Sequence, residues 1–150
     1  MPENWAFSKV AVRPIPTLVQ LLAYQGAERL RGAFAERGMA GLRPLHARLF
    51  LPLLSGGRRA SDLADRLGVS RQAVAQVVVI LERDGYVERL ADPGDARAKL
   101  ICLTARGRLA VRVMRNAALA EEERWRHLLG AEPLEQVRDA LIRLLSDPHR

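Results

Sequence analysis

The chain has 150 residues, a length that suits one domain with a single core and excludes a multidomain enzyme. Hydrophobic residues make up 49% and charged residues 27%, as in soluble globular proteins and unlike disordered ones. The formal net charge of +7 favours a polyanionic partner, such as nucleic acid or an acidic membrane surface.

The sequence lacks the signals of a membrane, secreted or metal-binding protein. No stretch approaches the roughly 20 apolar residues of a membrane helix, and the start at Met1 lacks the basic and apolar regions of a signal peptide. The single cysteine, Cys102, excludes an intrachain disulfide, and the three histidines stand far apart without carboxylate or thiol neighbours at ligand spacing. We therefore expect a cytoplasmic protein with no membrane association, no metal and no cofactor.

The positive charge is concentrated in the first two thirds of the chain. Residues 1–57 carry 7 basic and 3 acidic groups, an excess of +4, and residues 58–108 carry 10 and 7, an excess of +3. Residues 109–150 carry 7 of each sign. A charge-balanced last third is typical of solvated amphipathic helices.

The first half of the chain predicts helices. Thr17 is placed to cap a helix over about 17–37, since apolar residues recur there at helical spacing. A second helix is predicted from Pro44, with Leu49 and Leu53 facing inward. Pro52 lacks an amide hydrogen and crowds the preceding turn, so this helix is expected to kink or end early.

Two further helices are predicted on either side of a tight turn. The first runs over about 61–67, with Ser61 as its cap and Gly68 closing it. The second begins after Ser70, which caps it, and ends near Asp84. Its inward stripe at helical spacing consists of Val74, Val77, Val78 and Leu81.

The hydrophobic period then changes from helical to two. Residues 86–90 and 99–103 predict two strands, joined by a turn-rich segment over 91–98. Thr104 is placed to cap a long helix over about 105–128, and a last helix is predicted over about 134–145. The predicted fold is therefore mainly α with a small β-hairpin wing.

The order helix, glycine turn, helix, hairpin is that of a winged helix-turn-helix. In such a domain the second helix enters the major groove of DNA and the hairpin reaches along the duplex. The start of the second helix, Ser70, Arg71, Gln72 and Ala73, offers hydrogen-bonding groups and a small side chain that permit close approach to bases.

Four motifs resemble the MarR (multiple antibiotic resistance regulator) family of transcription factors. They are SDLADRLGVSRQAV over 61–74, LERDGYVER over 81–89, DPGDARAKL over 92–100 and LTARGR over 103–108. Helix-turn-helix patterns occur in many regulator families, whereas an Asp-x-Arg wing followed by Leu-Thr-x-x-Gly-Arg is much more specific. These motifs cover about a third of the chain, and the predicted helix order extends the resemblance across nearly all of it.

The resemblance implies one domain over 1–150, with a DNA-binding head over about 42–103 and dimerisation helices over about 17–37 and 105–147. It implies a homodimer that binds a pseudo-palindromic operator of double-stranded DNA. It also implies a lipophilic or phenolic effector that binds between head and dimerisation helices and shifts the spacing of the two heads. We expect a ligand-responsive repressor.

The resemblance also assigns contacts to individual residues. Arg97 is expected in the minor groove, where a guanidinium is drawn to the negative potential of narrow A·T-rich DNA, and Asp95 is expected to hold it in place. Base or phosphate contacts are expected on the second helix of the motif, and backbone contacts on both sides of the wing. The residues concerned are Ser70, Arg71, Gln72, Ala73 and Gln76 on the helix and Arg89 and Lys99 beside the wing.

Some residues allow a second interpretation. An exposed helix surface or loop would carry the same polar residues without binding DNA, and Arg58 and Arg59 fit a phosphate clamp and a solvated loop equally well. Gln76, where many family members have arginine, and the apolar pair Val79–Ile80 depart from the family pattern, so base preference is expected to differ.

The effector site is assigned less directly. Tyr24, His46 and Phe50 lie on helices that would line the family's ligand pocket, while a packed core is the usual place for such residues. Cys102 lies between Ile101 and Leu103 on a predicted strand, which favours a half-buried packing role.

Three alternatives remain. One is a redox-sensing regulator that acts through Cys102. Another is a winged-helix module that binds a protein instead of DNA. The third is an enzyme, which no arrangement of nucleophile, paired carboxylates or phosphate loop supports.

Overall fold

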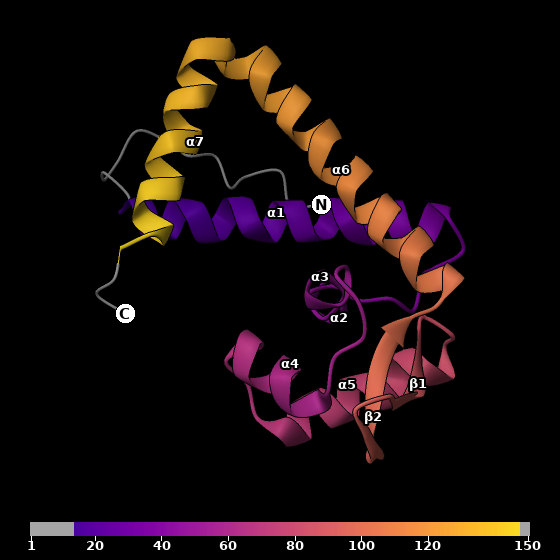
Figure 1. Cartoon of the computed structure of the whole chain (residues 1–150). Helices are drawn as coiled ribbons and strands as arrows, with labels where there is room; N and C mark the ends of the chain where they lie inside the picture. Colours follow the sequence, from indigo (N-terminus) through magenta and orange to yellow (C-terminus); the bar gives the residue numbers. More distant parts are fainter. Residues whose placement is uncertain (1–13, 148–150) are drawn as a thin grey trace.

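The computed structural model describes residues 14–147 and has the predicted fold class, mainly helical with one two-stranded hairpin (Figure 1). Three helices, α1, α6 and α7, form one end of the molecule, and the winged helix-turn-helix forms the other (Figure 1). In chain order the elements are α1 (Ile15–Glu36), α2 (Pro44–Ala47), α3 (Phe50–Leu53), α4 (Ala60–Leu67), α5 (Arg71–Arg83), β1 (Val87–Asp92), β2 (Asp95–Leu103), α6 (Ala105–Leu129) and α7 (Ala131–Leu145).

Helix α1 begins at Ile15, so the prediction that Thr17 caps it is wrong. Pro14 is the cap residue, without a side-chain hydrogen bond, and Pro16 lies in the first turn. The first turn of a helix tolerates proline because its amides have no partner inside the helix. The two prolines therefore lie at the start of α1.

The predicted second helix is interrupted, as Pro52 indicated. The chain forms two single-turn helices, α2 and α3, with the break between Ala47 and Phe50. A continuous helix would place the carbonyl of Arg48 against the Pro52 ring, so the break falls one turn before the proline. Leu49 and Leu53 are buried, as predicted.

Helices α4 and α5 are joined by the predicted glycine turn. Gly68 has a φ of 65°, in the left-handed region that glycine adopts at low cost. The Ser70 hydroxyl accepts a hydrogen bond from the amide of Ala73 at 3.1 Å and caps α5. The cap predicted at Ser61 is wrong, because α4 starts at Ala60 and the Ser61 hydroxyl donates to Asp62.

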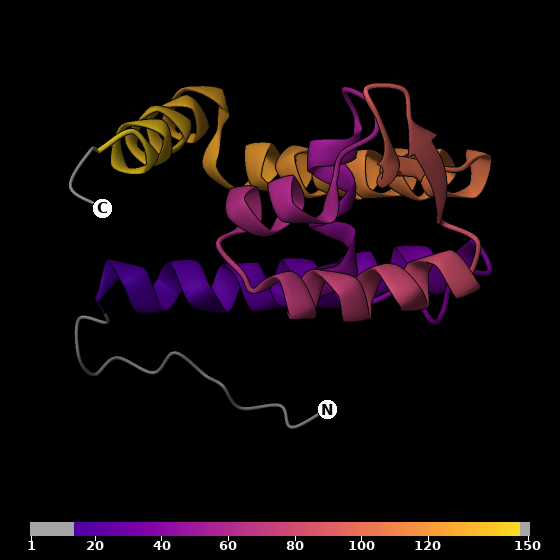
Figure 2. The same ribbon diagram turned by 60° about the horizontal axis from the view of Figure 1, so that its bottom comes forward.

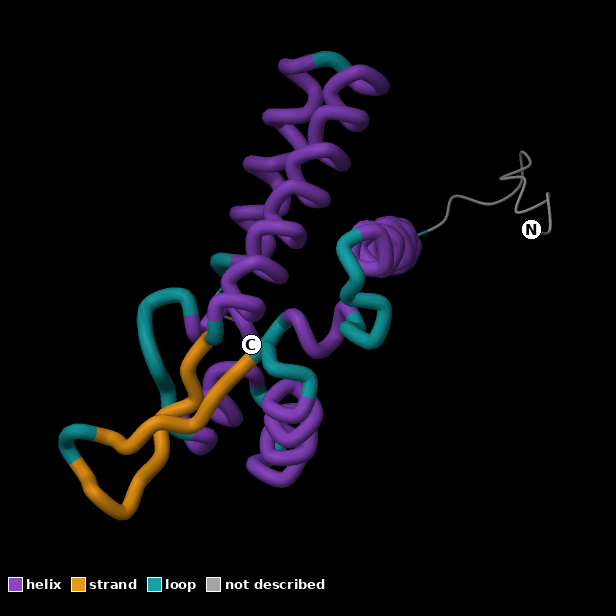
Figure 3. Tube along the Cα trace, turned by 90° about the vertical axis from the view of Figure 1, so that its right-hand side faces the viewer, coloured by secondary structure: helices purple, strands orange, loops and turns teal. Residues whose placement is uncertain are grey.

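The hairpin is longer than predicted. Strands β1 and β2 pair antiparallel, with Val87 opposite Leu103 and Leu90 opposite Leu100, and most of the expected loop is taken into the strands. Backbone hydrogen bonds between Arg58 and Ile101, at 3.0 and 2.8 Å, add a short third pairing at its base. Figure 3 shows the hairpin projecting away from the helices.

Helices α6 and α7 complete the fold. Thr104 caps α6 as predicted, since its hydroxyl accepts from the amide of Gly107 at 3.0 Å. Helix α7 starts at Ala131, earlier than predicted, and Pro133 is accommodated in its first turn. Together α1, α6 and α7 outline a triangle (Figure 1).

The main core joins the two ends of the molecule. It is built from the C-terminal part of α1, the α2–α3 segment, α4, α5, the base of the hairpin and the start of α6. Figure 2 shows these elements from another side. Phe34, Phe50, Leu63, Val78 and Leu81 are each fully buried in it. Among the residues described, no helix is long and apolar enough to cross a membrane.

Candidate nucleic-acid interface

One face of α5 is open to solvent along two turns. Gln72, Ala75, Gln76 and Val79 are exposed there, opposite the buried side chains of the core-facing stripe. Their spacing of i, i+3, i+4 and i+7 places them on one face of a helix, the arrangement with which a recognition helix can read a groove. We call these four residues the α5 stripe.

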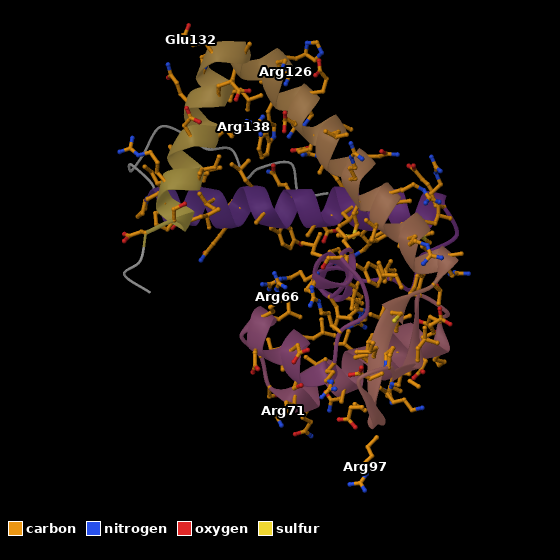
Figure 4. The ribbon with its side chains drawn as sticks, viewed as in Figure 1. Arg66, Arg71, Arg97, Arg126, Glu132 and Arg138 are labelled. Atoms are coloured by element: carbon orange, nitrogen blue, oxygen red, sulfur yellow. The ribbon has the colours of Figure 1, made fainter. Side chains whose placement is uncertain are left out.

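The predicted contacts at the start of α5 divide into two groups. Ser70 and Arg71 are exposed beside the α5 stripe, and Arg71 projects from the end of the molecule that lies away from α6 and α7 (Figure 4). Ala73 is only half-exposed and faces a small apolar cavity of about 140 Å³, which it lines with Val69 and Val77. Its side chain therefore belongs to the packing of the head.

The wing presents basic side chains. Arg97 extends beyond the tip of the hairpin (Figure 4) and forms no ion pair with any residue between 14 and 147. Lys99 is exposed on β2. Arg89 pairs with Glu82 at 3.4 Å. This ion pair links β1 to α5 and partly neutralises the charge of Arg89.

Asp95 supports Arg97 in a different way from the one expected. A carboxylate oxygen of Asp95 accepts the backbone amide of Arg97 at 3.1 Å, and the ion-pair partner of Asp95 is Arg59, at 3.6 Å. The expectation that Asp95 holds the Arg97 guanidinium is thus corrected. Asp95 fixes the backbone from which Arg97 projects and leaves that side chain available.

Arg59 binds the other end of the same turn. Its Nε and Nη2 donate to Asp92 Oδ2 at 2.8 and 2.5 Å, and Asp92 Oδ1 accepts from the amide of Gly94 at 2.9 Å. The amide of Gly94 and the guanidinium of Arg59 both lower the pKa of Asp92, while Asp92 raises the pKa of Arg59. Sequence reasoning missed this contact because nothing in the sequence links two residues 33 positions apart.

Arg58 is held by contacts within the protein. Its Nη2 donates to the hydroxyl of Ser55 at 2.9 Å, and its backbone pairs with Ile101. Its Nε is buried without a hydrogen-bond partner in the described chain. Arg58 and Arg59, which were considered for a phosphate clamp, thus make contacts with the loop before α4 and with the wing.

The most specific motif, Leu-Thr-x-x-Gly-Arg, builds the connection between hairpin and α6. The Thr104 hydroxyl donates to the carbonyl of Gly85 at 2.6 Å while it caps α6. A guanidinium nitrogen of Arg108 donates to the carbonyl of Leu103 at 2.7 Å. These contacts fix the direction in which the long helix leaves the head.

The three residues assigned to an effector site lie in different surroundings. Phe50 is fully buried and packs against Tyr86 with ring centroids 6.1 Å apart, whereas Tyr24 is 67% exposed on α1. His46 is buried, and its Nδ1 has no partner among the described residues. Burial, and then the charge of Arg43, lower the pKa of His46 and favour the neutral imidazole.

A large apolar cavity of about 790 Å³ lies between α1, α6 and α7 and involves none of those three residues. Charged groups occur at its edge, where Arg29 pairs with Glu121. The apolar lining residues are Ile15, Val19, Leu22, Ala23, Gly26, Leu30, Met114, Ala117, Ala118, Trp125, Val137, Ala140, Leu141 and Leu144. Ile15 and Leu144 are each 69% exposed, so the cavity opens to solvent.

Cys102 is half-buried on β2, as predicted. Its sulfur lies so close to Gly57 that a Cβ added at position 57 would stand 2.6 Å from it. Burial, and then the charge of Glu88, raise the pKa of the Cys102 thiol. A raised pKa lowers the fraction of thiolate, the form that reacts with peroxides.

Part of this sequence is similar to known proteins. Residues 40–98 match the sequence model of the MarR family. The transcriptional activatory protein BadR of Rhodopseudomonas palustris is 39% identical over 57 residues, which are 38% of this chain and 33% of BadR. The chain thus spans about a third of the length of the curated relative that it matches.

Solved structures share the fold. The reduced form of MarR from E. coli matches with a TM-score of 0.77 at 18% identity, over 91% of this chain and 99% of that one. A MepR mutant from S. aureus, bound to an oligodeoxyribonucleotide, matches with a TM-score of 0.61 at 20% identity, over 90% and 98%. The family match covers the head, and the fold match extends to the helices on both sides of it. Over residues 40–98 the chain therefore resembles the MarR family of winged-helix transcriptional regulators, and over most of its length it has the fold of the solved MarR structure.

Proposed function

We propose that this regulator binds a pseudo-palindromic DNA duplex as a homodimer, with α5 in the major groove and the wing in the minor groove. The observation that carries the proposal is that Arg71, at the start of α5, and Arg97, at the tip of the wing, project from the same end of the molecule (Figure 4). A helix and a hairpin presented together can engage adjacent grooves of one duplex.

The chemistry of this end of the molecule supports a nucleic-acid partner. Residues 58–108 carry an excess of +3, and Arg97 and Lys99 add exposed charge at the wing. Gln72 and Gln76 on the α5 stripe are amides of the kind that pair with adenine edges. The solved MepR complex with an oligodeoxyribonucleotide makes DNA the natural partner to test. A cytoplasmic location belongs to the same proposal.

The large apolar cavity supports the homodimer. Within the described chain, Leu134 is the one residue of α7 that is buried, while Ile142, Leu144 and Leu145 are more than half exposed. An apolar surface of this extent is stable in water only when it is covered. A second copy carries the same helices, and a two-fold axis would let each copy cover the other. We therefore assign α1, α6 and α7 to dimerisation and residues 42–103 to the head.

We also propose that a small lipophilic or phenolic effector binds where the head and the dimerisation helices meet. His46 supports this assignment, because a buried imidazole nitrogen without a partner can bond to a ligand hydroxyl. Tyr24, His46 and Phe50 remain the proposed contacts. An effector that binds one head spacing better than the other would change DNA affinity by that difference. Titration with alkylphenols tests this, and loss of their effect in His46→Gln is the expected result.

We propose repression as the sign of regulation. Repression needs only occupation of a promoter, whereas activation needs an additional surface for the polymerase. BadR, which is similar over 57 residues, is an activatory protein by its name, so the sign requires its own test. A reporter gene placed downstream of the selected operator is expected to be silent when the native protein is present. It is expected to be expressed when the protein carries Arg97→Ala.

The experiment that tests DNA binding is selection of duplexes from a random library at physiological salt. Enrichment of an inverted repeat with half-site centres about one helical turn apart is expected. Arg97→Ala should weaken binding to the selected duplex, whereas Arg126→Gln, which removes a charge near the α6–α7 turn (Figure 4), should not. Uniform, salt-sensitive binding without a motif would contradict the regulator proposal, and no binding at two salt concentrations would favour a protein-interaction module.

Dimerisation is tested separately. Leu141 lines the large cavity on α7, and Leu141→Glu places a charge on that surface. Sedimentation is expected to show a dimer for the native protein and a monomer for the variant. Leu51→Glu, at a residue 57% exposed on α3, is the matched control and should remain dimeric. A native protein that sediments as a monomer would contradict the assignment.

A further inference from the structure

We propose that Arg59 is a positioning residue for the wing: it holds the hairpin tip in the conformation that presents Arg97 to DNA and neutralises the acidic groups of that tip. The inference rests on the proposed DNA binding and assigns Arg59 a part in it. Arg59 lies in the head, directly before α4, and is the cap residue of that helix.

The geometry consists of a guanidinium held between two carboxylates. Asp92 is the last residue of β1 and Asp95 the first of β2, so the two frame the turn at the tip. Arg59 bonds to Asp92 at 2.8 and 2.5 Å and pairs with Asp95 at 3.6 Å. One side chain from the head therefore connects both strands of the wing at the point where they turn.

Each carboxylate in turn holds the backbone of the tip. Asp92 accepts the amide of Gly94 at 2.9 Å, and Asp95 accepts the amide of Arg97 at 3.1 Å. Loss of Arg59 would leave both carboxylates without their cationic partner and free to turn toward water. The backbone of Arg97 would then lose the support that fixes the direction of its side chain.

The charge of Arg59 matters as well as its geometry. Asp92 and Asp95 bring two negative charges to a tip that carries Arg97 and Lys99, so those four groups sum to zero. Arg59 raises the sum to +1 at the part of the head that approaches a polyanion. Without it, the two carboxylates would repel the phosphates that flank the minor groove.

Arginine suits this position better than lysine. A planar guanidinium can donate to both carboxylates at fixed angles, whereas an ammonium group acts as a point charge. Arg59→Lys should therefore restore the charge and only part of the order of the tip. Arg59→Gln removes both. The two variants separate the electrostatic contribution of Arg59 from its geometric one.

The first test is a double-mutant cycle on a fluorescent duplex enriched from a random library. Arg59→Gln and Arg97→Ala are each expected to weaken binding about tenfold, and the two together by clearly less than the roughly hundredfold loss of two independent contacts, since only the charge of Arg59 acts apart from Arg97. Arg59→Lys should fall between native and Arg59→Gln, and Arg126→Gln is the control for loss of one charge. Full additivity of the two losses would show that Arg59 contacts DNA on its own account and would overturn the positioning role.

The second test needs no DNA. Amide hydrogen exchange in the native protein and in Arg59→Gln is compared at Gly94 and Arg97, whose amides bond to the two carboxylates. Exchange at both is expected to accelerate about fivefold, with no change at Ala73 in the α5 cap. Unchanged exchange at Gly94 and Arg97 overturns the inference even when the protein binds DNA. A native protein that binds no duplex, yet shows the accelerated exchange in the variant, overturns the proposed function and the role of Arg59 in it while leaving the contact itself intact.

Discussion

Gly107, in the first turn of α6, lies directly against the backbone carbonyl of Tyr86, so that a Cβ at position 107 would overlap the carbonyl oxygen. The amide of Gly107 is bonded to the hydroxyl of Thr104, and that hydroxyl also donates to Gly85. A glycine is thus required for close approach of two backbones, where the head meets the long helix. This connection is one of two by which the chain links the head to the long helices, the other being the segment between α1 and α2.

Gly107→Ala is expected to lower the free energy of unfolding by about 1–3 kcal/mol, the usual cost of forcing an extra carbon into a packed site. Gly32→Ala is the matched control, since nothing lies within 4 Å of a Cβ at that position of α1. There the added methyl group should stabilise the helix by about 0.5–1 kcal/mol. Urea unfolding at one fixed protein concentration measures both, and equal effects of the two changes would contradict the packing argument.

Local chemistry made most of the fold predictable. The caps at Ser70 and Thr104 and the turn at Gly68 depend on contacts within a few residues, and all three are confirmed. The caps predicted at Thr17 and Ser61 are wrong because a neighbouring residue could start the helix equally well, and sequence does not rank such choices. Helix ends are decided by small differences that packing can reverse.

The candidate site was predictable where it depends on one helix and not where it depends on packing. Hydrophobic period placed Gln72 and Gln76 on the exposed side of α5. Asp95 is only two residues from Arg97, so a local pair was expected, yet the fold brings Arg59 to Asp95 instead. Arg59 reaches the wing because the segment before α4 pairs with β2, a contact that no local signal announces.

Stability is expected to fall in mildly acidic solution because of His46. Burial and Arg43 lower its folded pKa below the usual value of about 6.5, although Asp84 acts in the opposite direction. The unfolded chain therefore binds a proton more readily than the folded one between those two pKa values. His46 therefore leaves the free energy of unfolding unchanged above about pH 6.5. As the pH falls from there toward the pKa of His46 in the folded protein, the free energy of unfolding decreases.

Melting temperatures measured between about pH 7.5 and about pH 5.5 test this expectation. His46→Gln should show a smaller decrease across that range than the native protein. His127→Gln, at an exposed histidine of α6, is the control and should follow the native protein. The same decrease in native protein and His46→Gln would mean that other groups control the acid response.

We expect that Cys102 does not make DNA binding sensitive to peroxide. Its thiol is half-buried against Gly57 and has a raised pKa, so little thiolate is available for oxidation. Fluorescence anisotropy on the selected duplex should show the same affinity before and after hydrogen peroxide, in the native protein and in Cys102→Ser. Release of native protein by peroxide, with no release of Cys102→Ser, would establish the redox-sensing alternative.

Val79 is expected to contact a thymine methyl group. It is 57% exposed on the α5 stripe, one turn beyond Gln76, and an apolar side chain at this place is suited to the C5 methyl of thymine in the major groove. Replacing thymine by deoxyuridine, one position at a time, should weaken native binding about fourfold at one position of each half-site, which corresponds to the free energy of burying one methyl group.

The Val79→Ala variant should bind the thymine and deoxyuridine duplexes with equal affinity at that position. Val69→Ala, which changes an exposed valine outside the α5 stripe, should keep the native preference. A Val79→Ala protein that still distinguishes thymine from deoxyuridine at every position would show that the methyl group is read by another residue or by none.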